Sequence, residues 1–220
     1  MKDNLIIHIK NRRERGGYMF HLIQIIAALP VKILFPAKFY GKKNLPKGPC
    51  IIVSNHTSNT DSVLLIINTW EKKYFLAKKE LFKNKLFGWF IKRMGAIKID
   101  RQSSDVAAIK QSLKVLKDGK KLVIYPEGTR TNNANMQLGE VKHGASMFAI
   151  KAKVPLVPMF ISRKPKLFHK TRVYLGEPFT LEEFYGRKLD NETLDASSKV
   201  IAEKLNELHD IALNSLTKKD

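Results

Sequence analysis

A histidine and an aspartate five residues apart are the side chains of this 220-residue chain best suited to chemistry. His56 and Asp61 follow the apolar run 50–53, which we expect to be a buried strand, and Asp61 begins an apolar segment typical of a helix. In α/β folds, ligands bind at the carboxyl ends of strands. A carboxylate that accepts the N–H of one imidazole nitrogen leaves the other nitrogen able to take a proton. The spacing therefore predicts a general base with an orienting acid.

The same segment also fits a helix-capping pattern. Ser58 and Asp61 have the spacing of a capping box, in which an acidic side chain reaches back to the residue that begins the helix. An aspartate near a helix N-terminus is also favoured by the helix dipole alone. In that case His56 is an ordinary loop residue. This segment by itself leaves a catalytic and a structural interpretation open.

A second segment of interest follows another short apolar run, residues 122–125. Pro126 cannot donate a hydrogen bond to a sheet, so we expect the strand to end there. Gly128 allows a backbone to approach a ligand closely, and the guanidinium of Arg130 matches two phosphate oxygens at once. The alternative is a plain strand-ending turn with solvated Glu127 and Arg130.

Four sequence blocks in order resemble those of the lysophosphatidic acid acyltransferase family, glycerolphosphate acyltransferases that use acyl thioesters. The resemblance extends from about residue 40 to residue 176. The blocks are Asn55 to Asp61 (N-H-x-x-x-x-D), Lys79 to Arg101 with glycines at 88 and 95, Tyr125 to Arg130 ([FY]-P-E-G-T-R), and Val154 to Pro158. Lys142, His143 and Gly144 are also similar to a Lys-x-Gly segment of the family.

The resemblance implies an α/β fold with a mixed sheet flanked by helices. It implies transfer of an acyl group from a thioester to the free hydroxyl of 1-acylglycerol 3-phosphate, which gives phosphatidic acid in phospholipid biosynthesis. His56 is then the general base and Asp61 orients it. Direct transfer is expected, because no Ser, Cys or Lys is placed as a nucleophile beside His56. The expected substrate-binding residues are Arg101, Glu127, Gly128, Thr129, Arg130 and Lys142.

The donor and acceptor are less narrowly defined. The resemblance implies acyl carrier protein or coenzyme A as the carrier of the acyl thioester, lysophosphatidic acid as the acceptor, and no cofactor. One rival function is an acyltransferase that acts on glycerol 3-phosphate or another lysophospholipid. The other is a non-catalytic basic membrane-binding module, in which His56 and Asp61 have only structural roles.

The charge of the chain implies an anionic partner. Forty Lys and Arg residues against twenty Asp and Glu residues give a formal net charge of +20. Anionic lipid, an acidic carrier protein and a phosphorylated substrate all fit, whereas no nucleic-acid-binding signature accompanies the charge. Cys50 is the only cysteine and lies in an apolar run, which excludes an internal disulfide and argues against a thiol nucleophile. The histidine spacing predicts no metal site.

Residues 1–40 differ from the catalytic domain expected over residues 41–220. A basic stretch at 10–15 precedes an apolar region too interrupted for a spanning helix. We expect an amphipathic pair of helices in the membrane interface, with its apolar side chains in the acyl layer. These are Phe20, Ile23, Ile26, Leu29 and Ile33. The expected location is the cytoplasmic face of the cell membrane, as a peripheral or monotopic protein. Packing of the segment on the core, and a signal peptide, are the alternatives.

From residue 44 onward, strands and helices alternate, which favours an α/β layer architecture. Ser104 or Asp105 can cap a helix that runs to Lys117 and stops at Gly119. The remaining expected elements are helices over 144–151 and 194–216 and strands over 154–162 and 172–175. Two prolines in the strand over 154–162 predict an edge position or an irregular course.

Overall fold

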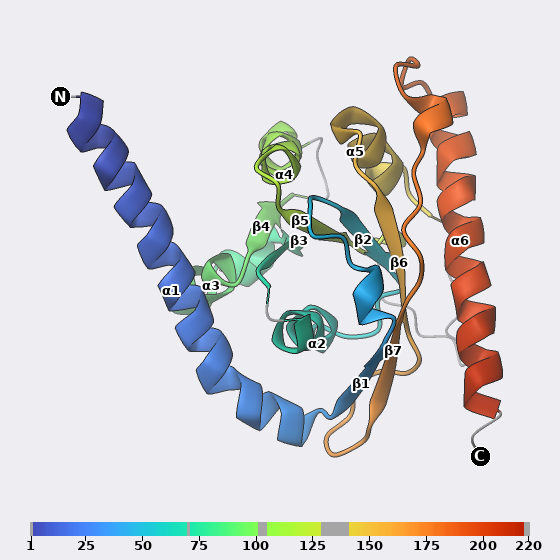
Figure 1. Ribbon diagram of the computed structural model, residues 1–220, viewed down its shortest axis with the longest axis horizontal. Coiled ribbons are helices and arrows are strands. Elements are labelled where there is room, and N and C mark those ends of the chain that lie inside the picture. The colour runs from blue at the N-terminus through green and yellow to red at the C-terminus, as the bar shows by residue number, and fades with distance from the viewer. Residues whose placement is uncertain (1, 70, 101–104, 129–140, 218–220) are drawn as a thin grey trace.

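The computed structural model describes residues 2–69, 71–100, 105–128 and 141–217 (Figure 1). The strands of this part form one seven-stranded sheet with the order β1-β7-β6-β2-β5-β3-β4. The sheet is mixed, because β6 and β7 pair antiparallel and all other neighbours pair parallel. The strands are β1 (Ala37–Tyr40), β2 (Ile51–Ser54), β3 (Lys73–Lys78), β4 (Ala96–Ile99), β5 (Lys121–Ile124), β6 (Leu156–Ile161) and β7 (Thr171–Leu175). The predicted α/β class is confirmed.

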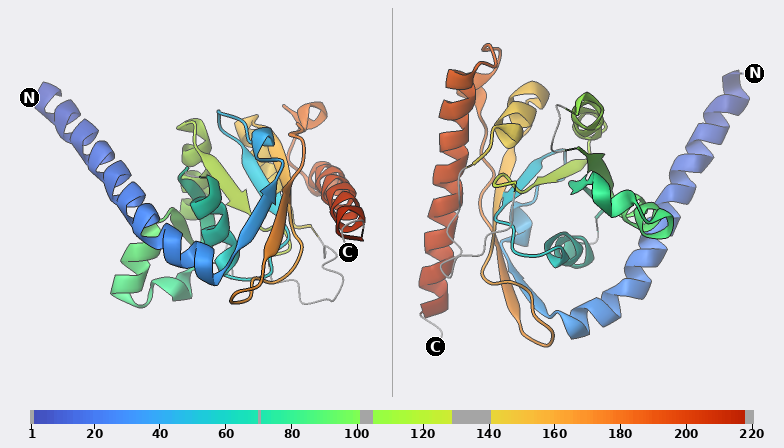
Figure 2. Two further views of the ribbon diagram at one scale, coloured as in Figure 1. Left: turned by 60° about the horizontal axis from the view of Figure 1, so that its bottom comes forward. Right: turned by 180° about the vertical axis from the view of Figure 1, so that it is seen from behind.

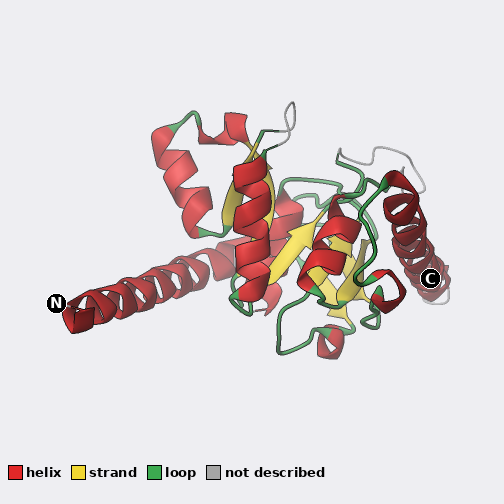
Figure 3. Cartoon of the chain, turned by 90° about the horizontal axis from the view of Figure 1, so that it is seen from above, coloured by secondary structure: helices red, strands yellow, loops and turns green. Residues whose placement is uncertain are grey.

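Helices cover both faces of the sheet (Figures 1 and 3). One face carries α4 (Val106–Lys117), α5 (Gly144–Ala152) and α6 (Asn191–Thr217). The other carries α2 (Thr60–Thr69), with α1 (Lys2–Leu34) and α3 (Lys85–Arg93) on the same side. Short 3-10 helices occur at η1 (Lys42–Asn44), η2 (Lys79–Phe82) and η3 (Glu182–Phe184). The helices predicted over 144–151 and 194–216 are confirmed as α5 and α6.

Alternate side chains of the central strands fill two separate cores. In β2, Ile51 and Val53 pack towards α4, α5 and α6, whereas Ile52 packs with Leu65 of α2 on the opposite face. All four residues of β2 are buried, as a strand covered on both faces requires. The apolar run before His56 is thus a central strand, and the loop that follows it starts from the buried centre of the sheet.

The strands that precede the two sequence motifs are parallel neighbours. β5 pairs with β2 on one side and with β3 on the other. Their last residues, Ser54, Ile124 and Lys78, therefore lie at one edge of the sheet, which we call the carboxyl edge. This arrangement brings the loop with His56 and the loop after residue 125 together, although 70 residues separate them in the chain.

The helix after β4 begins as predicted. Asp105 is the cap of α4, and one of its carboxylate oxygens, Oδ1, accepts a hydrogen bond from the Ala108 N–H at 2.9 Å. The other oxygen, Oδ2, accepts the Asp100 N–H at 2.9 Å. These backbone hydrogen bonds lower the pKa of Asp105, since they favour the charged carboxylate. Asp105 therefore ties the end of β4 to the start of α4 at the carboxyl edge.

The position predicted for the strand over 154–162 is wrong. That strand is β6, which lies between β7 and β2, and every residue of it is buried. Pro155 precedes the strand, and Pro158 lies where the pairing of β6 with β7 begins. The missing N–H of Pro158 affects only the end of that ladder, and its carbonyl still accepts from the Gly176 N–H at 2.9 Å. Two prolines are therefore compatible with a central strand.

The N-terminal segment also differs from the prediction. The expected pair of helices is one continuous helix, α1, which contains Pro30 and ends at Leu34. Residues 37–40 form β1, which pairs parallel with β7. The sheet therefore begins four residues before the boundary expected at residue 41, and the N-terminal segment is connected directly to an edge strand.

The expectation that Phe20 faces an acyl layer is wrong. Phe20 is buried against Ile66 and Met94, and Ile23 is partly buried in the same cluster. Gln24 is also buried, and its side-chain nitrogen donates to the Ile66 carbonyl at 2.8 Å. One stripe of α1 thus packs on α2, as the alternative interpretation proposed. The other predicted residues, Ile26, Leu29 and Ile33, are exposed.

Replacement of Gly95 by Ala should destabilise the fold severely. Gly95 connects α3 to β4 with φ of +104°, and a Cβ there would lie 2.2 Å from the Lys73 carbonyl oxygen, so two backbones must separate. Gly119 is a matched control, because its φ is +75° and a Cβ meets nothing within 4 Å. We expect Gly119→Ala to cost about 1–2 kcal/mol and Gly95→Ala at least about 2 kcal/mol more. Urea unfolding measures both, and equal losses would contradict the close approach.

Candidate active site

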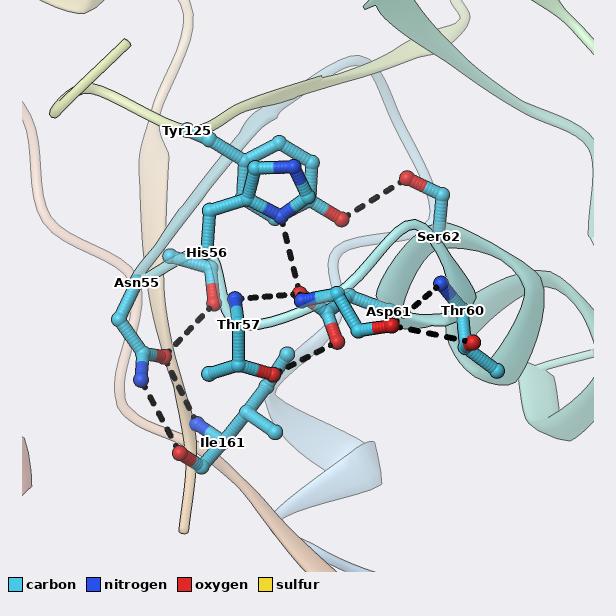
Figure 4. Close-up of polar contacts among 10 residues, drawn as sticks. Asn55, His56, Thr57, Thr60, Asp61, Ser62, Tyr125 and Ile161 are labelled. Atoms are coloured by element: carbon cyan, nitrogen blue, oxygen red, sulfur yellow. Dashed lines mark hydrogen bonds and ion pairs between the residues drawn. The ribbon is translucent and has the colours of Figure 1, made fainter. Parts of the chain in front are cut away.

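His56 and Asp61 are brought together by the turn between β2 and α2 (Figure 4). His56 lies in the loop after β2, and Asp61 lies in the first turn of α2. Their Nδ1 and Oδ2 atoms are 2.9 Å apart, and the His56 side chain is 16% exposed whereas that of Asp61 is fully buried. No described residue forms a hydrogen bond with the other ring nitrogen, Nε2. The geometry is that of an imidazole held by a carboxylate and open to a substrate at one nitrogen.

The buried carboxylate of Asp61 accepts three further hydrogen bonds. The Thr57 N–H and the Ser58 N–H donate to Oδ2 at 2.7 and 2.8 Å, and the Thr57 hydroxyl donates to Oδ1 at 2.9 Å. The Ser58 oxygen in turn accepts the Thr60 N–H at 3.2 Å. Asp61 therefore forms the capping contact of the structural interpretation and the histidine contact of the catalytic one. The two interpretations describe one carboxylate.

Asn55, to which the motif assigns no separate role, joins the His56 loop to the neighbouring strand. Its side-chain nitrogen donates to the Ile161 carbonyl at 3.0 Å, and its side-chain oxygen accepts the Ile161 N–H at 2.9 Å. The Ser54 hydroxyl donates to the same oxygen at 3.3 Å. Asn55 is completely buried and continues the β2–β6 pairing with its side chain (Figure 4). It holds the backbone in place one residue before His56.

Tyr125 supports the ring of His56. The two rings stack with their centroids 4.1 Å apart and an angle of 20° between their planes. The Tyr125 hydroxyl and the Ser62 hydroxyl are 2.8 Å apart, which joins the end of β5 to α2. Desolvation of the hydroxyl, with the charge of Asp61 adding to it, raises the pKa of Tyr125 well above its usual range. The hydroxyl is therefore a neutral hydrogen-bonding group, and the ring face lies against an imidazole that becomes cationic when it takes a proton.

The loop after β5 brings two of the predicted substrate-binding residues together. A Cβ on Gly128 would lie 3.1–3.2 Å from the side chain of Lys142, so Gly128 leaves the space that this lysine occupies. The Lys142 N–H donates to the Pro126 carbonyl at 3.0 Å, which brings the two sides of the loop together. Glu127, which lies between Pro126 and Gly128 in the sequence, is buried. Arg101, Thr129 and Arg130 lie outside the described residues.

A cavity of about 280 Å³ adjoins this loop. Its apolar walls include Leu76, Ile99 and Tyr125, and Asp100, Gly128 and Lys142 also line it. Tyr125 is shared, since it lines the cavity and also stacks on His56. Asp100 is 2.6 Å from the Lys79 ammonium nitrogen, and that hydrogen bond raises the pKa of Lys79. The cavity therefore lies next to the ring that stacks on His56, and it has an ion pair and a further lysine near it.

Cys50 is removed from the chemistry by burial. It lies fully buried directly before β2. Burial raises the pKa of Cys50 to about 12, so the thiol is protonated near neutral pH and is a poor nucleophile. This agrees with the prediction that the thiol takes no part. In the part of the chain that the structure describes, no cluster of three or more His, Cys, Asp or Glu side chains could hold a metal ion.

Fold and site together define the class of this protein. A family model described as Acyltransferase matches residues 36–162, more than half of the chain. The chain belongs to this acyltransferase family. The match includes both motifs and begins just before β1, which agrees with the sheet starting before residue 41. The family resemblance predicted from the sequence blocks is confirmed.

The relatives have a consistent description. The chain is 33% identical over 178 residues to a 1-acyl-sn-glycerol-3-phosphate acyltransferase of Bacillus subtilis (strain 168), covering 78% of this chain and 87% of the relative. It is 40% identical over 111 residues to a protein of the same name from Streptococcus pneumoniae, covering 50% of this chain and 40% of that relative. The fold resembles the crystal structure of the 1-acyl-sn-glycerophosphate acyltransferase PlsC from Thermotoga maritima. That comparison has a TM-score of 0.65 and 25% identity, and covers 90% of this chain and 82% of the other.

Replacement of Asp61 by Asn should reduce both turnover and stability. An amide in this position presents a donor where the carboxylate now accepts from His56 or from backbone N–H groups. We expect a loss of about 10²–10⁴-fold in turnover, and a loss of about 0.5–2 kcal/mol in unfolding free energy from the helix cap. A turnover assay of the purified variant measures the first loss, and urea unfolding measures the loss in unfolding free energy.

Thr57→Val is the matched control for that variant. It removes the hydroxyl that donates to Oδ1 and leaves the His56 contact and both backbone donors in place. We expect a stability loss of about 1.5–3 kcal/mol with turnover reduced by less than about tenfold. If Asp61→Asn also kept most of its turnover, the carboxylate would be a helix cap only.

Proposed function

We propose that this protein transfers an acyl group from a thioester to the free hydroxyl of 1-acylglycerol 3-phosphate, giving phosphatidic acid in phospholipid biosynthesis. The observation that carries the proposal is the pair His56 and Asp61 at the carboxyl edge, with Nδ1 of the imidazole held at 2.9 Å and Nε2 open. The Bacillus subtilis and Streptococcus pneumoniae relatives have the name of this activity, which supports the choice of acceptor.

The proposed reaction is direct transfer. The acceptor hydroxyl gives its proton to Nε2 of His56 as its oxygen attacks the thioester carbonyl carbon. The carbon–sulfur bond then breaks, and the proton passes from His56 to the leaving thiolate. Asp61 keeps Nδ1 protonated and stabilises the imidazolium between the two proton transfers, and the face of Tyr125 adds to that stabilisation. Since the thiol of Cys50 is buried and protonated, an acyl-enzyme on sulfur is not part of the scheme.

The acceptor phosphate is proposed to bind in the cavity beside Tyr125. Lys142 and Gly128 line this cavity, and Arg130 follows Gly128 by two residues. Asp100 also lines it, and Arg101 is the next residue. The described neighbours of both arginines thus converge on one space, which supports the proposal that the two guanidinium groups and Lys142 bind phosphate oxygens. Glu127 and Thr129 are proposed to bind hydroxyl groups or to orient an arginine.

The proposed location of the enzyme is the cytoplasmic face of the membrane, where acyl carrier protein or coenzyme A carries the acyl donor. The acyl chains of the acceptor and of the product stay in the bilayer, so the enzyme must bind to the membrane surface. None of the described helices is long and apolar enough to cross a membrane. The outer side of α1 exposes apolar side chains, and the basic stretch at 10–15 precedes them. Together these features support a peripheral attachment through α1.

Replacement of His56 by Ala should abolish most of the activity and leave the protein folded. General-base catalysis is typically worth about 10²–10⁴-fold, and His56 donates to no partner that the fold depends on apart from Asp61. The assay is the release of free thiol from an acyl thioester in the presence of lysophosphatidic acid. His169→Ala is the matched control, since His169 is exposed and its side chain bonds only to the nearby Leu167 carbonyl among the described residues.

The same assay separates the rival functions. Thiol release should require an acceptor and should be greatest with lysophosphatidic acid. Greater turnover with glycerol 3-phosphate or with a lysophospholipid that lacks the phosphomonoester would assign a related acyltransferase instead. If none of the three acceptors supported thiol release, the catalytic assignment would be wrong. It would also be wrong if His56→Ala kept more than about a tenth of the normal rate.

Replacement of Arg130 by Ala should weaken the use of the phosphorylated acceptor specifically. A charge-assisted hydrogen bond contributes about 1.5–3 kcal/mol, which corresponds to a loss of about 10- to 150-fold in kcat/KM for lysophosphatidic acid. The affinity for the thioester donor should change little. Arg187→Ala is a suitable control, because Arg187 lies over the ring of Phe184, in the segment that follows Phe179. Phe179 pairs with Leu156 at the start of β6, at the end of the sheet opposite to the carboxyl edge. An equal loss of activity towards an acceptor without the phosphomonoester would contradict phosphate recognition by Arg130.

A further inference from the structure

The outward face of α3 is apolar. Leu86, Trp89 and Phe90 have the spacing of one helical face, and they are 77%, 47% and 39% exposed. A helix on the surface of a globular protein normally directs its apolar stripe to the core and its polar residues to water. Here the large apolar side chains point away from the core. Because nothing in the fold covers them in the described residues, this face favours a partner outside the chain.

The orientation of α3 is fixed by the fold. Gly88, on the opposite side of the helix, packs so closely on η2 that a Cβ would lie 3.1 Å from the Phe82 Cα. Asn84 caps the helix and accepts the Phe87 N–H at 3.0 Å, and Met94 at the other end is buried with Phe20 of α1. The helix therefore cannot rotate its apolar face inward without losing these contacts.

The helix α1, which packs beside α3, also has exposed apolar side chains. Figures 1 and 2 show α3 next to α1 in each view, and the cluster of Phe20 with Met94 joins them. The exposed apolar residues of α1 from residue 18 onward include Tyr18, Leu22, Ile25, Ile26, Leu29 and Ile33. Two neighbouring helices thus present apolar residues to the outside, α1 held by a buried stripe and α3 by the packing of Gly88 on η2. A surface that extends over two helices is larger than scattered exposed residues would give.

Cationic side chains surround the apolar face of α3. Lys83, Lys85 and Lys92 are exposed, and the Arg93 guanidinium lies 5.3 Å from the Trp89 ring centroid. Aromatic and aliphatic residues on one face with lysine and arginine around them are the composition of helices that lie in the interface of an anionic bilayer. An acidic carrier protein would match the lysines, but it would leave the wide apolar surface of α1 and α3 in water. The charge and the apolar area together favour a lipid surface.

We infer that α3 is a second membrane-contacting element, which inserts Leu86, Trp89 and Phe90 into the interface of an anionic bilayer beside α1. η2 and α3 leave the sheet directly after Lys78, the last residue of β3, at the carboxyl edge. Contact through α3 would therefore bring the edge with His56 towards the lipid. The contact itself does not depend on the reaction, whereas this consequence for acceptor access rests on the proposed function.

Trp89 reports on this contact directly. The chain has two tryptophans, so in Trp70→Phe the emission comes from Trp89 alone. The intact variant is titrated with phosphatidylcholine vesicles containing phosphatidylglycerol, with and without lipids brominated near the headgroup end of the acyl chain. We expect the Trp89 emission to shift to shorter wavelength and to lose intensity with the brominated lipids. Co-sedimentation of the same samples measures the bound fraction.

Ile211 supplies the matched control position. It is an exposed apolar residue of α6, on the opposite side of the molecule from α1 (Figure 1). The variant Trp70→Phe, Trp89→Phe, Ile211→Trp should sediment with vesicles and show no shift or quenching. The inference is overturned if both positions respond equally, if Trp89 stays unchanged in protein that sediments, or if the protein does not sediment. A response of Trp89 to apo-acyl carrier protein and not to vesicles would also overturn it, in favour of a protein partner.

A pair of charge substitutions tests the energetic contribution of the face. Leu86→Glu with Phe90→Glu should lower the vesicle partition coefficient by about tenfold or more, whereas Ile211→Glu should leave it unchanged. An unchanged partition coefficient in the first variant would contradict the inference. Turnover with detergent-solubilised lysophosphatidic acid should be equal in both variants and the wild type. Absence of that turnover in the wild type would refute the proposed function and leave the sedimentation result standing.

Discussion

The buried carboxylate of Asp61 is the interaction on which the site depends. A fully buried charge is costly unless donors surround it, and Asp61 accepts from one imidazole, one hydroxyl and two backbone N–H groups. Each donor comes from residues 56–58, so satisfying the charge also folds the loop between β2 and α2. The orientation of the His56 ring is therefore a consequence of a local structure that the chain needs in any case. Asn55 on one side and Tyr125 on the other connect this structure to β6 and β5.

The sequence predicted the contact between His56 and Asp61 better than the residues that support it. His56 and Asp61 are recognisable because their residue types and their spacing limit them to a few roles. The supporting contacts are harder to predict from a motif. Thr57 contacts Asp61 across the turn, and Ser62 contacts Tyr125 although 63 residues separate them in the sequence. Asn55 stands next to the histidine in the motif, yet its role depends on β6 lying beside β2, which only the sheet order shows. The histidine contact of the catalytic interpretation and the backbone contact of the capping interpretation are both present, because one carboxylate has four donors.

The fold shows the same division between local and tertiary information. Apolar runs, the cap at Asp105 and the glycine stop at residue 119 placed most helices and strands, since these signals act within one turn of the chain. The position of β6 could not be read in this way. A proline removes one backbone hydrogen-bond donor, but it can still occupy a central strand. Pro158 lies at the end of the pairing between β6 and β7, so only a terminal hydrogen bond is missing. Similarly, Pro30 did not divide α1, because its ring lies on an exposed side of a long helix where water can satisfy the freed carbonyl.

The N-terminal helix has two apolar stripes, and the distinction between them links fold to function. Phe20, Gln24 and Ala28 are buried at successive helical turns, and the amide of Gln24 bonds to the Ile66 carbonyl of α2. These contacts set the rotation of α1 about its own axis. Once that rotation is set, Leu22, Ile25 and Leu29 face outward. Their exposure to water is unfavourable for the chain by itself. The apolar surface is thus oriented by the fold that also positions His56, because α2, which packs on α1, has Asp61 in its first turn. The orientation of α1 and the position of the His56 ring are consequently connected through one helix, α2, which packs on α1 and holds Asp61 in its first turn.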